Sequence, residues 1–74
     1  MKMATALNLK VLRTDLGWSR NKLAEEAGLS DQAVRKAEAG RLIRPDTAKA
    51  IADALSRGFG REILVSDIEG LNTM

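Results

Sequence analysis

The 74-residue chain contains no cysteine, no histidine and no tyrosine. Cysteine nucleophiles, histidine general bases and zinc sites built from Cys and His all need side chains that are missing here. These absences exclude most kinds of enzyme. We therefore expect a protein without catalytic activity that needs no metal ion or other cofactor.

Aromatic residues and proline are scarce as well, because the chain has only one Trp, one Phe and one Pro. Alanine and leucine dominate instead, and these residues favour helices over a small β-barrel or sandwich. A chain of this length is enough for one domain. The sequence therefore predicts a single domain over residues 1–74 with a core of aliphatic side chains.

The apolar runs are short and are interrupted by charged residues. None approaches the roughly 20 residues that a membrane-spanning helix needs, and residues 1–11 lack the apolar stretch and cleavage site of a secretory signal. We therefore expect a soluble, cytoplasmic protein with no membrane partner.

The net charge of +2 is unevenly distributed along the chain. Residues 10–45 carry eight basic and five acidic side chains, whereas residues 46–74 carry three basic and five acidic ones. A molecule with a basic side and an acidic side is suited to binding a polyanion through one face.

Single glycines and small capping residues divide the first part of the chain into predicted helices. Leucines at helical spacing predict a first helix over residues 4–16. Ser19 is placed to cap a second helix that stops at Gly28, and Ser30 to cap a third helix that stops at Gly40. The third helix is expected to turn a polar, basic face outward.

The second part of the chain is less regular. Asp46 is expected to cap a fourth helix with a continuous apolar face. Residues 57–65 are predicted to form a loop, with an extended piece at residues 62–65. The run Ser66-Asp67-Ile68-Glu69 has the pattern of a capping box and predicts a short fifth helix through Leu71. The predicted fold class is thus all-α, a compact arrangement of five helices.

The most specific pattern spans the second and third predicted helices. It reads Leu23-Ala24-x-x-Ala27-Gly28-Leu29-Ser30-x-x-x-Val34-x-x-x-Glu38-x-Gly40 and is followed by Arg44-Pro45. With these residues the chain resembles the phage-repressor and Cro type of helix-turn-helix, the lambda-repressor-like regulators also called xenobiotic-response-element-like. The resemblance extends over about residues 9–55. It implies a Cro-like or repressor-like transcriptional regulator that binds operator sites in double-stranded DNA.

The resemblance also assigns roles to individual residues. It implies that the outer face of the third helix contacts bases in the major groove through Asp31, Gln32, Arg35 and Lys36. It implies phosphate contacts from Ser19, Arg20, Arg41 and Arg44. It further implies a structural ion pair between Arg13 and Glu38. The alternative for the third helix is that its polar side chains form an ordinary solvated face. The alternative for Arg13 and Glu38 is that they are two unrelated surface charges.

Apolar residues in the C-terminal region exceed what one short helix needs for closing the core. We therefore expect a homodimer that places two recognition helices about 34 Å apart. Its expected interface is formed by the apolar residues Phe59, Ile63, Leu64, Val65, Ile68 and Leu71, or by edge-to-edge pairing of residues 62–65. The alternative is that these side chains cap the core of each protomer.

Two other functions are compatible with the same sequence. Antitoxins of toxin–antitoxin pairs use this fold, and a toxin would then be the protein partner. The chain could also be a helical protein-interaction module that does not bind DNA. Retention on heparin with a steep salt dependence would distinguish a DNA-binding protein from such a module.

Overall fold

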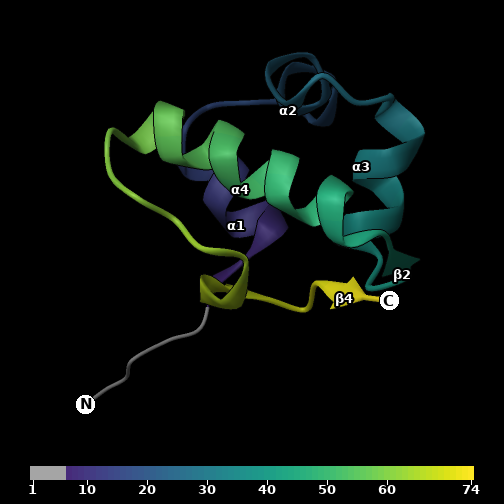
Figure 1. The fold of residues 1–74 in the computed structure, drawn as a ribbon. Coiled ribbons are helices and arrows are strands. Elements are labelled where there is room, and N and C mark those ends of the chain that lie inside the picture. Colours follow the sequence, from purple (N-terminus) through teal and green to yellow (C-terminus); the bar gives the residue numbers. More distant parts are fainter. Residues whose placement is uncertain (1–6) are drawn as a thin grey trace.

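Figure 1 shows the fold of the computed structural model, which describes residues 7–74. The longest helix, α4, runs through the middle of the molecule, and three shorter helices surround it. Within the described residues the helices are α1 (Leu9–Asp15), α2 (Arg20–Ala27), α3 (Asp31–Glu38) and α4 (Pro45–Phe59). The expectation of a mainly helical fold is confirmed, with four helices in place of the predicted five.

The serine caps of α2 and α3 form as predicted. The Ser19 hydroxyl accepts a hydrogen bond from the backbone N–H of Lys22 at 3.0 Å, and Ser30 accepts one from Ala33 at 3.1 Å. Gly28 ends α2 with a φ of 70°, a left-handed conformation that glycine adopts without steric cost. These local interactions fix the turn between α2 and α3.

α1 is shorter than predicted. It begins at Leu9, and the Asn8 side chain caps it by accepting a hydrogen bond from the Val11 N–H at 2.9 Å. Residues Leu7–Asn8 form the short strand β1 instead of a helical turn. The remaining part of the predicted helix, residues 4–6, lies outside the described residues.

The expected cap at Asp46 is wrong. α4 starts two residues earlier, with Arg44 as the N-cap and Pro45 at the first helical position, where proline sacrifices no intrahelical hydrogen bond. Asp46 lies in the first turn, and its carboxylate accepts a hydrogen bond from the Thr47 N–H at 2.9 Å. The helix also continues to Phe59, through the start of the predicted loop.

The predicted fifth helix is also wrong. Residues Val65–Asp67 form a single 3₁₀ turn, η1, in which the Asp67 carboxylate accepts a hydrogen bond from the Leu64 N–H at 2.9 Å. Two short strands follow, β3 (Ile68–Glu69) and β4 (Asn72–Thr73). Residues 61–74, here called the C-terminal arm, therefore continue as turns and strands.

Pairing with distant segments of the chain replaces the expected helix. β3 pairs in parallel with β1, and β4 pairs in parallel with β2 (Leu42–Ile43), the strand between α3 and α4. A further hydrogen bond runs from the Met74 N–H to the Ile43 carbonyl at 3.0 Å. The C-terminal arm thus returns to the end of α3, as the yellow segment in Figure 1 shows.

The core lies between α4 and the helices around it. Its fully buried members come from every helix and include Leu9, Leu23, Val34, Ile51 and Leu55. Burying each such side chain stabilises the fold by about 1.5–3 kcal/mol. Within residues 7–74, no helix combines the length and apolar character needed to cross a membrane.

The C-terminal arm completes this core, and that corrects the expected dimer surface. Ile63 and Ile68 are each only 4% exposed within the protomer, so placing them on a surface between protomers was wrong. Phe59 and Val65 are partly buried and pack against the same core. Leu64, in contrast, is 50% exposed.

Candidate nucleic-acid interface

The helices joined at Gly28 pack through small side chains. Ala24 on α2 and Ala37 on α3 are both buried, so the two helix backbones can approach closely. Val34 on α3 is completely buried as well. Because these residues face inward, the opposite face of α3 is turned toward solvent.

That outward face carries the side chains predicted to contact bases. Gln32, Arg35 and Lys36 are exposed, and Asp31 is partly buried at the start of the helix. The Arg35 guanidinium donates to the Asp31 carboxylate at 2.8 Å, and the two side chains are 61% and 39% exposed. A pair this exposed contributes about 0–1 kcal/mol, so Arg35 can leave Asp31 for another partner at little cost.

The residues predicted to contact phosphates lie at several places around α3. Arg41 borders a shallow hollow of about 450 Å³ on the outer face of the helix, together with Arg35 and Lys36. Arg44 directly follows the strand β2 as the N-cap of α4, with its guanidinium 3.3 Å from the Asp46 carboxylate. Ser19 and Arg20 are exposed at the start of α2 and border neither this hollow nor the groove between α3 and β2.

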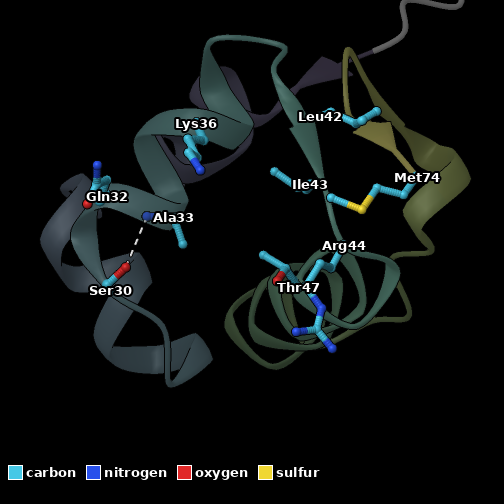
Figure 2. A pocket seen from close by; sticks show the side chains of 9 residues that line it. All are labelled: Ser30, Gln32, Ala33, Lys36, Leu42, Ile43, Arg44, Thr47 and Met74. Carbon is cyan, nitrogen blue, oxygen red and sulfur yellow. Dashed lines mark hydrogen bonds between the residues drawn. The ribbon is translucent and has the colours of Figure 1, made fainter.

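A groove of about 290 Å³ separates α3 from β2 and the start of α4, as Figure 2 shows. Gln32 and Lys36 line it from α3. Leu42 and Met74 form part of the opposite side, and Arg44 and Thr47 lie toward α4. The groove thus joins three side chains predicted to contact DNA with three that the sequence did not single out.

Those three additional residues are Leu42, Thr47 and Met74. Met74 reaches the groove because β4 pairs with β2, a contact between segments about thirty positions apart in the sequence. Two-residue strands leave no hydrophobic periodicity, so no local pattern indicates this pairing. Leu42 and Thr47 lie within three residues of Arg44 in the sequence. This proximity to a predicted phosphate contact was the only sequence signal for their place in the groove.

The predicted ion-pair residues Arg13 and Glu38 lie in contact. The Arg13 Nε donates to one carboxylate oxygen of Glu38, and its Nη2 donates to the other at 3.3 Å. Its Nη1 donates to the Trp18 backbone carbonyl at 3.0 Å. Both charged side chains are only 11% exposed. One guanidinium therefore links α1 to the turn before α2 and to the end of α3.

A second ion pair lies on the surface of α2. The Lys22 ammonium is 2.9 Å from the Glu26 carboxylate, one helical turn away. The hydrogen bond from Lys22, assisted by its charge, lowers the pKa of the Glu26 carboxyl below its ordinary value. The same contact raises the pKa of Lys22. Both groups consequently carry their charges near neutral pH. Because the two charges are opposite, the pair adds nothing to the net charge of α2.

The sequence matches the family model described as helix-turn-helix over residues 9–60. The match starts with α1 and ends just after α4, so it includes α2, the turn at Gly28 and α3. Comparison with curated proteins and with solved structures gives no significant match. The matched segment is slightly longer than the residues 9–55 identified from the sequence motif, and the C-terminal arm lies outside it.

Proposed function

The chain belongs to the Cro/C1-type helix-turn-helix family of DNA-binding transcriptional regulators, and we propose that it recognises a specific operator sequence by placing α3 in the major groove. The proposed output is regulation through occupancy of that operator, as in a Cro-like repressor. DNA contact, and not catalysis, is the activity on which this proposal depends.

The observation that carries the proposal is the division of α3 into two faces. Val34 and Ala37 hold its inner face in the core, while Gln32 and Lys36 are exposed on the other. An α-helix fits the major groove of B-DNA, and polar side chains on its outer face can then reach base edges. The buried contact between Arg13 and Glu38 supports this role because it fixes the orientation of α3.

We assign base contacts to the outer face of α3. The Gln32 amide can form a bidentate contact with adenine, and Lys36 can donate to the O6 and N7 atoms of guanine. Arg35 would take part after exchanging Asp31 for a base, which the exposure of that pair allows. Asp31 lies in the first turn of α3, and we assign it a stabilising role there because the helix dipole favours a negative charge. The alternative is that its carboxylate accepts a hydrogen bond from the N4 group of cytosine.

We assign phosphate contacts to residues on either side of α3. Arg41 and Arg44 are exposed just after the helix. Arg41 borders the hollow on the outer face of α3, and Arg44 borders the groove between α3 and β2. Ser19 and Arg20 lie at the start of α2, where backbone N–H groups and the helix dipole favour an anion. Contacts of this kind set register and affinity without reading sequence.

The salt dependence of duplex binding tests the proposal. If about three to five phosphates are neutralised per protomer, the plot of log K against log salt should have a slope of roughly −3 to −4.5. Replacing both Arg41 and Arg44 by Ala should weaken binding to all sequences and make the slope shallower by about 2. Undiminished binding by this double variant, or a binding constant independent of salt, would contradict the proposal.

A further inference from the structure

The groove between α3 and β2 has one apolar side that is unusually exposed. Leu42 and Met74 line it with 53% and 70% of their surfaces exposed. They are two of the four large apolar residues in the described part of the chain that are exposed, and both line this groove. Exposed apolar side chains that gather at one place favour a binding surface.

The other residues of the groove indicate the charge of the occupant. Lys36 and Arg44 are both exposed there, and no acidic residue is among the described residues that line it. A second copy of this chain would bring the same positive charges to the contact and be repelled. A positively charged border with an apolar side instead favours an anionic partner that also presents apolar surface.

The position of this apolar side is fixed by backbone hydrogen bonds. β4 pairs with β2 in the register that sets Asn72 beside Leu42, and the Met74 N–H donates to the Ile43 carbonyl at 3.0 Å. Figure 2 shows Met74 facing α3 across the groove, beside Ile43. The C-terminal arm thus brings a side chain from the end of the described chain next to the proposed DNA-reading helix.

We propose that this groove receives one strand of the DNA backbone. A polynucleotide strand alternates anionic phosphates with deoxyribose rings whose C–H groups are largely apolar, which matches the groove in both respects. Arg44 meets a phosphate oxygen, the Thr47 hydroxyl donates to another, and Leu42 and Met74 pack against a sugar, while Lys36 extends from the α3 side of the groove to the base edges. This assignment rests on the proposed function and adds the C-terminal arm to the DNA-contacting surface.

Substitutions by glutamate test the assignment on the full chain. Leu42→Glu and Met74→Glu each add a negative charge to the groove. The control, Val11→Glu, adds the same charge on α1, a helix that borders neither the groove nor the hollow on the outer face of α3. Val11 is 39% exposed, so all three variants should melt close to the wild type. We expect each groove variant to bind a duplex about tenfold more weakly than the Val11→Glu control.

Lysine in place of Leu42 or Val11 provides a second test, with the salt dependence of binding as the measured quantity. Leu42→Lys should steepen the slope of log K against log salt by about 0.9, because one more phosphate is neutralised, while Val11→Lys should leave the slope unchanged. Equal affinities of Leu42→Glu and Val11→Glu for a duplex that the wild type binds would overturn the inference and leave the proposed function standing. Failure of the wild type to bind any duplex would overturn both.

Sedimentation of the same variants excludes a second explanation. If Leu42→Glu or Met74→Glu changed the oligomeric state of the free protein, the groove would join two copies of the chain and the inference would be wrong. We expect the wild type and both variants to sediment alike.

Discussion

Arg13 binds Glu38 across 25 positions of sequence, and the same guanidinium holds the backbone carbonyl of Trp18. Glu38 is the last residue of α3, so this contact determines how the end of that helix sits against α1. The orientation of the outer face of α3 therefore depends on an interaction made on its inner side.

Breaking the Arg13–Glu38 pair should destabilise the protein. Arg13→Ala or Glu38→Ala leaves one charge poorly solvated and unpaired, so each should lower the free energy of unfolding by up to about 3–5 kcal/mol. The double variant Arg13→Met, Glu38→Leu should be much milder, because no charge remains. Urea denaturation measures all three.

The exposed pair between Lys49 and Asp53 provides the control. Their side chains are 71% and 50% exposed, so Lys49→Ala should change the free energy of unfolding by no more than about 0.5 kcal/mol. Equal stabilities for Arg13→Ala and Lys49→Ala would show that the Arg13–Glu38 contact is only a solvated surface pair.

The close packing at Gly58 makes a second prediction. A Cβ atom there would lie 2.7 Å from the Leu16 Cδ1 and 2.9 Å from the Trp18 Cη2. Gly58→Ala should therefore destabilise the protein by about 1–3 kcal/mol through overpacking, although alanine is the better helix former. Thermal unfolding of the variant measures the effect. Combining it with Leu16→Ala should recover part of the loss, and a stabilised single variant would contradict the packing described here.

The helix caps show which parts of the fold the sequence predicts well. Ser19, Ser30 and Gly28 act through hydrogen bonds and backbone angles within a few residues, so their signals are local and readable. The cap at Asp46 was wrong because Pro45 favours the first helical position and moves the start of α4 forward. Two local signals conflict at this point, and the preference of proline for the first helical position outweighs the capping preference of aspartate.

The C-terminal arm shows where sequence reasoning fails. Its Ser66-Asp67-Ile68-Glu69 run has the pattern of a capping box, but Asp67 instead binds the Leu64 N–H, and Ile68–Glu69 pairs with Leu7–Asn8. Pairing between segments about sixty positions apart depends on the tertiary fold and not on local propensity. The contribution of Met74 to the groove was missed for the same reason.

The surface pair on α2 predicts a specific pH dependence. Because the pKa of Glu26 is lowered, its contribution to stability is present above its ordinary pKa and is lost as the pH falls through the lowered value. Because the pKa of Lys22 is raised, its contribution is present below its ordinary pKa and is lost as the pH rises through the raised value.

Titration of the Glu26 carboxyl by NMR tests this dependence. Lys22→Ala should raise the pKa of Glu26 toward its ordinary value, since the hydrogen bond and the neighbouring charge are both removed. Lys22→Arg keeps the charge and should preserve most of the lowering. Identical titration curves for the wild type and Lys22→Ala would refute the assignment.

The proposed homodimer has a testable surface in the C-terminal arm. With Ile63 and Ile68 buried, the exposed Leu64 and the partly buried Phe59, Val65 and Leu71 are what remains of the expected interface. Leu64→Asp should therefore yield a folded monomer, because a charge at an apolar contact between identical surfaces is repelled by its twin. Sedimentation velocity measures the change, and Val11→Asp is the matched control. A wild type that remains monomeric at high micromolar concentration would contradict the dimer.

The central claim is that α3 reads base sequence, and selection of bound duplexes from a random pool tests it most directly. The wild type should enrich one motif. Gln32→Ala and Lys36→Ala should each lose preference at one or two base pairs of it, at a cost of roughly 1–3 kcal/mol on the best site. Arg44→Ala should retain the motif with uniformly weaker binding. A wild type that enriches no motif, or variants at Gln32 and Lys36 that enrich the unchanged motif, would contradict the account.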